Sequence, residues 1–488
     1  GLVGSEMCIR DRMEFVERVA PYEPWYRLSE DLRAWLQDDG DPTHEVRVRA
    51  MAFEWGPDGK SRIGASAEAS GARVARTWPS GHVVELWVDR DQLRGLAALD
   101  DVLWVDRWTP PGDDMDLVRI DAGADWSEAN FGYCGQGVRG EVMDGGTQLD
   151  HPDFDGIMSH GIVDSGSHGT STYGIVFGNG DRDGDGEAKA TGLLPCAEQG
   201  IAADYTNLTD RFAHTEELKN PPFLASFQTN SWGASQTTQY TSDSHELDDI
   251  IWRLDFAILN SQSNTGNRNS RPQAWAKNMI SVGGIKHYET LDPSDDAWDG
   301  GASIGPAADG RIKPDISYWY DLIDTTTIGS GYTSSFGGTS AATPESAGVL
   351  GLMLQMWSEN VWDTDPEGAT VFERQPHFST LKALLINNAQ QYDFTGSSAD
   401  LSRFKQGWGR PRARVASESA VHSVMVDEDV ALELDVVVSF DVDVLPCESE
   451  LKVTMVYPDP PGTTSSSLLR INDVNLEVSS PSATVYHG

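Results

Sequence analysis

The segment from Gly337 to Pro344, with the sequence GGTSAATP, places a serine where it could act as a nucleophile. Ser340 would stand on a tight turn before a helix, and the unpaired N–H groups at a helix N-terminus stabilise negative charge that develops nearby. The glycines before Ser340 permit close approach of a substrate, and the alanines after it begin the helix without crowding. Most serines in such a position are simple N-caps. The complete octet is far more specific than a lone serine, and we therefore predict that Ser340 is a nucleophile.

A nucleophilic serine requires a base, and the base requires an acid that orients it. His168 opens the segment HGTSTYG, which predicts a helix of small residues packed closely on a sheet. Asp144 follows the apolar run Val138–Met143 and precedes two glycines, so it would lie at the carboxyl end of a strand, where open α/β sheets place their sites. Singly, Asp144 could be a turn residue and His168 a helix cap or a core histidine. His160 also precedes a glycine but lacks the helical continuation, so we rank it below His168 as the base.

The elements that must position these residues change in character along the chain. Between about residues 123 and 410, short apolar strands are followed by glycine-rich turns and helical segments, which predicts a parallel α/β sheet with helices on both faces. The preceding hundred residues show the strand, helix, strand order of a small α+β unit. From about residue 415 helical periodicity disappears and strands dominate, which predicts an antiparallel β-sandwich.

We therefore divide the 488 residues into four parts, which are 1–12, 13–112, 113–412 and 413–488. The first part, GLVGSEMCIRDR, resembles translated sequencing-adapter read-through, and we exclude it from the fold. The second is the α+β unit, the third the α/β domain and the fourth the β-sandwich, which we expect to be truncated.

Three motifs in this order resemble those of the subtilisin-like serine peptidases, the subtilases. They are VMDGGTQLDHPDF around Asp144, HGTSTYG at His168 and GGTSAATP around Ser340, and ASIGPAADGRIKPDI at 302–316 resembles a further family segment. The interval between Asp144 and His168 is short for the family, so the loop between them should differ from the family pattern, whereas the two residues match it. The resemblance implies a subtilisin-like fold and an Asp/His/Ser triad. It also implies that residues 83–108 end a propeptide, and that the β-rich region is the sandwich of the alkaline, oxidatively stable members.

The resemblance further implies a side-chain amide that stabilises the oxyanion. Asn264 falls at that position after the apolar run 256–259, and Asn260 and Asn267 are the alternatives, since asparagine also forms ordinary turns. Ser263, immediately before Asn264, is predicted to contact substrate.

A second segment resembles the family strand whose backbone pairs with an extended substrate. It comprises Ser231, Trp232 and Gly233, and an ordinary strand end is the alternative.

An acidic loop, DRDGDGE, carries carboxylates at alternating positions, a pattern that suits Ca²⁺. The predicted ligands are Asp181, Asp183, Asp185 and Glu187, and Asp153 matches a residue that ligates the same ion in subtilases. The loop lacks the final glutamate of an EF-hand, and a solvated acidic turn is the alternative reading.

Composition excludes several classes of partner. The chain has 36 Lys and Arg against 76 Asp and Glu, a net charge of −40, which repels nucleic acid and anionic lipid. No apolar run is long enough to cross a bilayer. The four cysteines are too few for a disulfide framework, although Cys134 and Cys196 could pair.

We predict a serine endopeptidase precursor, or zymogen, that acts on polypeptides and is inhibited by its own propeptide. We expect a secreted, extracellular monomer whose signal peptide was lost with the missing N-terminus. The rival is a catalytically silent, Ca²⁺-dependent binding protein on the same scaffold, which an incomplete triad would favour. An esterase would be expected to carry G-x-S-x-G and the order Ser, Asp, His, neither of which occurs here.

Overall fold

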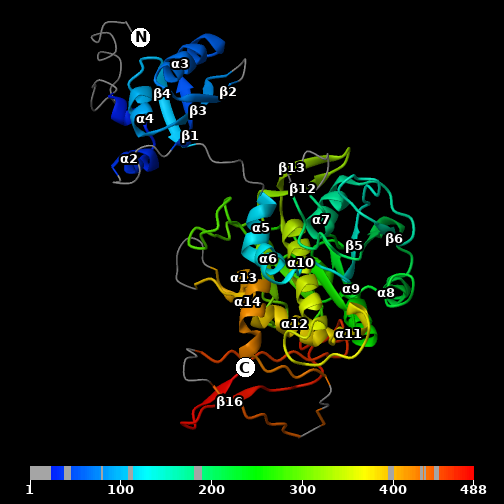
Figure 1. Ribbon diagram of the computed structural model, residues 1–488. Helices are drawn as coiled ribbons and strands as arrows, with labels where there is room; N and C mark the ends of the chain where they lie inside the picture. Colours follow the sequence, from blue (N-terminus) through cyan, green and yellow to red (C-terminus); the bar gives the residue numbers. More distant parts are fainter. Residues whose placement is uncertain are drawn as a thin grey trace, which may run out of the picture. The chain divides into compact units, whose positions relative to one another are not determined.

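The computed structural model describes residues 23–37, 45–77, 81–107, 114–180, 190–393, 401–428, 432–433, 436–444 and 450–488. The chain forms two compact units, Gly1–Pro111 and Gly112–Gly488, and each is described by itself (Figure 1).

Unit 1 is built on a four-stranded antiparallel sheet with the strand order β2-β3-β1-β4. Its elements are η1 (Pro24–Arg27), α2 (Glu30–Gln37), β1 (Val46–Ala52), α3 (Pro57–Ala69), β2 (Arg73–Thr77), β3 (Val83–Val88), α4 (Arg90–Ala97) and β4 (Val102–Arg107). In β1, Val46, Val48 and Ala50 are buried and alternate with more exposed residues, because successive side chains of a strand face opposite ways. The buried face belongs to a separate hydrophobic core within this unit.

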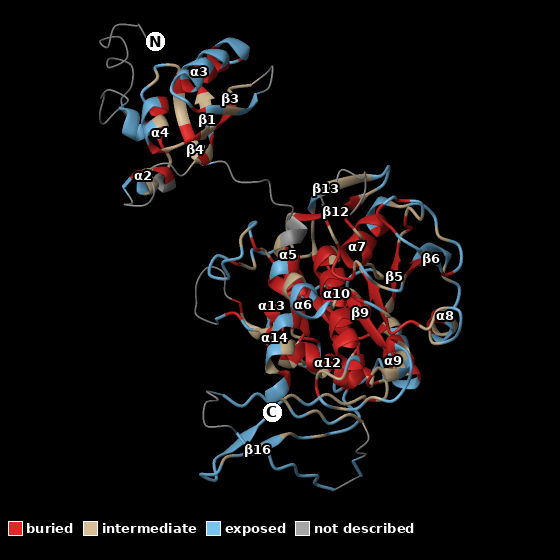
Figure 2. Ribbon diagram, viewed as in Figure 1, coloured by how far each residue is buried: buried red, intermediate tan, exposed pale blue. Residues whose placement is uncertain are grey.

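Unit 2 contains a seven-stranded sheet with the order β11-β10-β9-β8-β5-β7-β6. The strands are β5 (Arg139–Asp144), β6 (Met158–Ser159), β7 (Gln199–Asp204), β8 (Phe227–Asn230), β9 (Ala257–Ser261), β10 (Ile280–Ile285) and β11 (Ile316–Trp319). Every pairing in it is parallel. The central strands are buried on both faces, as parallel sheets covered by helices are (Figure 2). The predicted α/β fold class is therefore confirmed.

The helices of unit 2 surround this sheet, and α10 is the most buried of them (Figure 2). They are α5 (Asp114–Ala122), α6 (Ala124–Phe131), α7 (Ser167–Phe177), α8 (Arg211–Leu218), α9 (Ser242–Leu254), α10 (Thr339–Ser358), α11 (Val371–Arg374), α12 (Phe378–Asn387), α13 (Arg403–Gln406) and α14 (Ala413–Ser419). The remaining elements are η2 (Tyr205–Asn207), η3 (Pro272–Trp275), η4 (Ala420–His422), and the strand pairs β12 (Ile323–Thr327) with β13 (Gly331–Phe336) and β14 (Ala389–Gln390) with β15 (Arg410–Pro411). Within the described ranges, no helix combines the length and the apolarity that a membrane span requires.

The chain after residue 412 remains attached to unit 2. Ala413 and Ala416 of α14 are fully buried in the same hydrophobic core as the sheet. Further on, the carboxylate of Asp459 contacts the ammonium group of Lys277, and Leu469 is buried. In the described part of this region the strands are the paired β16 (Glu477–Ser479) and β17 (Val485–His487), so the β-sandwich stays a prediction.

Candidate active site

Asp144 and His168 meet at the carboxyl end of β5. His168 lies in the first turn of α7, and its Nδ1 is 2.7 Å from Oδ1 of Asp144. The carboxylate is buried and also accepts hydrogen bonds from the Thr172 hydroxyl (3.1 Å) and the Gly145 N–H (2.7 Å). Gly169 permits this approach, because a Cβ there would lie 1.9 Å from the carbonyl oxygen of Gly146. The imidazole is therefore held by a carboxylate whose own position is fixed.

The environment of His168 alters its basicity. Burial lowers the pKa of the imidazole, but the hydrogen bond and the charge of Asp144 outweigh burial and leave the pKa raised. The side chain is 45% exposed, and its ring edge contacts Phe336 at a centroid distance of 5.4 Å. With Nδ1 turned toward Asp144, Nε2 is the nitrogen available to a substrate or a nucleophile.

Ser340 is the second residue of α10 and the one residue of that helix that is not buried. Its carbonyl oxygen accepts a hydrogen bond from the hydroxyl of Ser231 (2.9 Å), which connects the start of α10 to the end of β8. Gly338, the N-cap, has φ of 83°, and a Cβ there would lie 2.9 Å from Nδ2 of Asn264. Glycine suits this position, since this φ strains other residues and a Cβ would displace the amide of Asn264.

Asn264 faces the same turn. Its Oδ1 accepts hydrogen bonds from the N–H (2.9 Å) and the hydroxyl (3.1 Å) of Thr339, so its Nδ2 is the end that remains available as a donor. Asn264 is exposed, whereas Asn260 is fully buried and donates to the carbonyl of Trp232. The amide of Asn267 is engaged within its own loop by Thr265. Of the three asparagines considered from the sequence, Asn264 is the one that contacts Thr339, the residue before Ser340.

The sequence model of the Subtilase family matches residues 135–409, more than half of the chain. The chain belongs to the subtilase family. It is thus a serine peptidase by family, and its matched region contains the segments that carry Asp144, His168 and Ser340. Among solved structures, the prenylagaramide maturation protease PagA is similar, with 18% sequence identity and a TM-score of 0.45 over 58% of this chain and 93% of that chain.

The two predicted substrate segments of the subtilase contact the turn at Thr339 and Ser340. Trp232 stacks on Tyr205 with ring centroids 4.3 Å apart, which builds an aromatic surface beside the carboxyl end of β8. Ser263 is buried with φ of 103°, and its N–H donates to the Thr339 hydroxyl (3.2 Å). Ser263 therefore contacts the residue before Ser340, and its hydroxyl accepts a hydrogen bond from the amide of Gln236.

The predicted calcium ligands are only partly within the described residues. Asp153 is fully buried, and its Oδ1 accepts a hydrogen bond from the Gly180 N–H at 2.8 Å. The other predicted ligands, Asp181, Asp183, Asp185 and Glu187, lie outside the described residues. Asp153 thus contacts Gly180, the last described residue before the acidic loop, and its role as a calcium ligand stays a prediction.

His160, the weaker candidate base in the sequence, lies elsewhere. Its Nδ1 is 2.7 Å from Glu141, a fully buried carboxylate in the middle of β5 that also contacts His214. Burial raises the pKa of Glu141, but its contacts with the two histidines dominate and lower it to about 2. Sequence reasoning missed this cluster; the one local signal was a glutamate within a strand that is largely buried.

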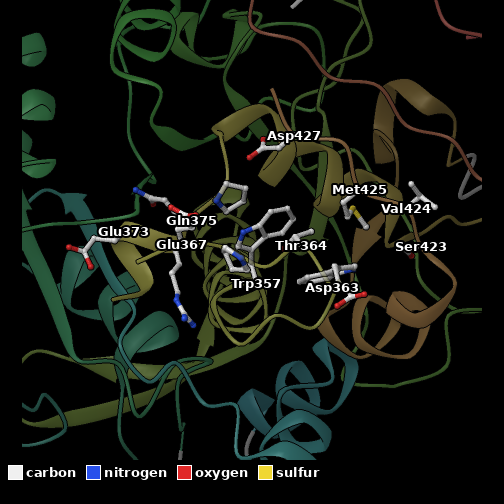
Figure 3. A pocket seen from close by; sticks show the side chains of 14 residues that line it. Trp357, Asp363, Thr364, Glu367, Glu373, Gln375, Ser423, Val424, Met425 and Asp427 are labelled. Carbon is white, nitrogen blue, oxygen red and sulfur yellow. The ribbon is translucent and has the colours of Figure 1, made fainter. Parts of the chain in front are cut away.

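A cavity of about 550 Å³ opens at the far end of α10 (Figure 3). Its walls include Trp357, Trp362, Pro376, Met425 and Asp427. Because an α-helix rises about 1.5 Å per residue, Trp357 is about 25 Å along the helix from Ser340. This cavity is therefore separate from the candidate active site.

Proposed function

We propose that this subtilase is a secreted serine endopeptidase in which Asp144, His168 and Ser340 form the catalytic triad. The observation that carries the proposal is the 2.7 Å contact between His168 and a buried, fully hydrogen-bonded Asp144 at the carboxyl end of β5. Ser340 begins a buried helix beside Asn264, which supports its role as the nucleophile. The alternative, a silent binding protein on this scaffold, is disfavoured because none of the three residues is replaced.

The residues act in sequence on a peptide bond. Nε2 of His168 accepts the proton of the Ser340 hydroxyl as its oxygen attacks the peptide carbonyl carbon. Asp144 holds the Nδ1 proton and stabilises the imidazolium that forms. His168 then gives the proton to the leaving amine, which leaves an ester between Ser340 and the acyl part of the substrate. Water, activated by the same imidazole, hydrolyses that ester and regenerates the serine.

The negative charge on the substrate oxygen requires fixed donors. Nδ2 of Asn264 is available for this task because Oδ1 of the same amide is held by Thr339. Backbone N–H groups at the start of α10 add to it, and the positive end of the helix dipole favours the oxyanion. We assign Ser231, Trp232, Gly233 and Ser263 to binding of the extended substrate.

The remaining parts of the proposal concern maturation and calcium. Unit 1 has its own sheet and core, which supports a role as a propeptide that is removed from a zymogen. The disulfide between Cys134 and Cys196, with Cα atoms 5.2 Å apart, favours an oxidising compartment and hence secretion. The buried carboxylate of Asp153 beside the acidic loop suits Ca²⁺, and Asp153 together with Asp181, Asp183, Asp185 and Glu187 would hold the ion.

Digestion of a denatured protein tests the activity. The full chain should cut it at internal peptide bonds, identified by mass spectrometry of the fragments, and should release unit 1 with a new N-terminus near residue 112. Ser340→Ala should do neither, whereas Ser335→Ala, an exposed serine on β13, should behave as the parent chain. Equal cleavage by Ser340→Ala would reject the proposal.

Separately, chelation should lower the thermal midpoint reversibly, and an Asp153→Asn variant that keeps the full calcium response would exclude this calcium site.

A further inference from the structure

Three side chains that chelate metals converge inside unit 2, away from the triad. They are Glu141 on β5, His160 just after β6 and His214 on α8, and one ligand atom from each lies within 4.8 Å of the others. The imidazole Nδ1 of His160 is 2.7 Å from Glu141, and Nε2 of His214 lies 3.0 and 3.1 Å from its two oxygens. The Glu141 and His160 side chains are 0% and 4% exposed, and that of His214 is 14% exposed.

A second layer of polar groups holds these three side chains in place. Nε2 of Gln228 donates to Oε1 of Glu141 at 2.7 Å, which fixes the carboxylate from the neighbouring strand β8. A carboxylate oxygen of Glu217 lies 3.1 Å from Nε2 of His160, on the side of the ring away from Glu141. Histidines that bind metals usually donate their second ring N–H to such a group, which sets the tautomer and leaves the other nitrogen free for the ion.

We propose that Glu141, His160 and His214 bind a divalent transition-metal ion, with Zn²⁺ as the best match. Two imidazole nitrogens and one carboxylate oxygen form a donor set that zinc accepts, and it leaves one coordination position for water. Because zinc–ligand bonds are about 2.0 to 2.2 Å long, two donors on one ion are at most about 4.4 Å apart, so the three groups are near the required spacing and must close slightly around the ion. Ca²⁺ and Mg²⁺ prefer oxygen donors alone, so this site and the acidic loop select different metals.

Binding requires one rearrangement within the cluster. The rings of His160 and His214 are stacked, with centroids 3.7 Å apart and an angle of 20° between their planes. Because the lone pair of an imidazole nitrogen lies in the ring plane, one ring must turn before both can point at one ion. In the described part of the chain the hydrogen bonds of the His214 ring are those of Nε2 to Glu141, so turning the ring breaks no hydrogen bond to another residue. The ion replaces the protons that join the histidines to the carboxylate.

The position of Glu141 gives the ion a structural role. Side chains alternate along a strand, so Glu141 and Asp144 project to opposite faces of the sheet. Glu141 accordingly contacts α8, whereas Asp144 contacts α7. An ion here would link three elements, namely β5, α8 and the segment after β6. It would lie on the face of β5 opposite Asp144 and would take no part in peptide hydrolysis.

Titration of the full chain with zinc tests the proposal. The Ser340→Ala background prevents self-digestion, and excess Ca²⁺ fills oxygen-only sites. After removal of metals by a chelator, calorimetry should detect one zinc ion bound in the micromolar range or tighter, and zinc should raise the thermal midpoint. His214→Asn should weaken binding about 100-fold or more and Glu217→Gln about 10-fold, which is the scale of second-layer effects.

His245→Asn is the control, because His245 is an exposed histidine that hydrogen-bonds the carbonyl of Gly462 and lies outside the cluster. It should bind zinc as the parent does. Cobalt gives an independent readout, since Co²⁺ bound by the parent should show visible absorption bands that His214→Asn lacks. The proposal is overturned if the folded parent binds no zinc under these conditions, or if His214→Asn and His245→Asn bind it equally well. Glu141→Gln repeats the test, and the far-ultraviolet circular dichroism of each variant shows that it is folded.

Discussion

Strand β5 carries two buried carboxylates, Asp144 and Glu141, and each is paired with histidine, yet the two pairs are built for different tasks. In the described structure His168 uses only Nδ1, on Asp144, and its side chain is 45% exposed. His160 has both ring nitrogens engaged, by Glu141 and Glu217, and is 4% exposed. A histidine can exchange protons with a substrate only when one nitrogen is left free, so exposure and a single partner distinguish the catalytic candidate from the structural one.

The largest expected difference between the two histidines is in catalytic activity after each is replaced by alanine. His168→Ala should lower kcat/KM by about 10⁴-fold or more, because the general base is lost. His160→Ala should change kcat/KM by only a few-fold in whatever fraction remains folded. Hydrolysis of a peptide substrate, normalised to folded protein, measures both. A large loss in His160→Ala with normal folding would show that the comparison assigns the roles wrongly.

Stability should respond in the opposite order. His160→Ala removes a partner from the buried Glu141 and should cost about 3 kcal/mol of unfolding free energy, the lower end of the range for a broken buried pair. The loss of unfolding free energy should stay at this lower end because His214 and Gln228 still contact Glu141. His168→Ala should cost much less, since its ring is nearly half exposed. Urea unfolding in the Ser340→Ala background with a chelator measures both; equal losses would contradict the distinction.

Two asparagines extend the comparison to the oxyanion. Asn264→Ala should lower kcat about 10²- to 10³-fold with little change in KM, the loss that one such donor causes in enzymes of this family. Asn260→Ala should mainly destabilise unit 2, because its buried amide holds the carbonyl of Trp232. Steady-state kinetics on folded protein measures kcat and KM for both variants. A selective kcat loss in Asn260→Ala would transfer the oxyanion role to that residue.

The pH profile should sharpen the description of His168. Its pKa is raised above the usual value of about 6.5, and only the neutral imidazole can act as a base, so activity should be lost as pH falls through this raised pKa. Asp144→Asn should move the acidic limb of the residual activity downward, because the charge that raises the pKa is removed. A limb that stays in place would mean that another group titrates.

The charged imidazolium of His168 also adds to the free energy of unfolding below a pH of about 6.5, and this contribution is lost as pH rises through the folded pKa.

The catalytic candidates could be predicted from sequence because the information is local. A glycine-flanked serine before a helix, or an aspartate after an apolar strand, specifies its own backbone geometry, and the parallel sheet follows from the alternation of strands and helices. The Glu141 cluster could not be predicted in this way. His160 and His214 reach Glu141 only after β6 and α8 have packed on the sheet, and no short motif records that contact.

The chain after residue 412 shows the same limit. Composition suggested a change of fold class there, yet the small side chains of Ala413 and Ala416 pack into the core of unit 2, and Asp459 contacts Lys277 across a long sequence separation. Small buried alanines carry little sequence signal, and the pairing of strands depends on partners that are distant in the chain. The β-sandwich therefore stays a prediction.

Covalent labelling tests the central assignment most directly. A serine-directed phosphonate should react with the folded chain at a single residue, and peptide mass spectrometry should place the adduct on Ser340. Labelling should vanish in Ser340→Ala, fall sharply in His168→Ala and persist in His160→Ala, because only His168 activates the nucleophile. An adduct on another serine, or equal labelling rates in the two histidine variants, would contradict the assignment of Asp144, His168 and Ser340 as the catalytic triad.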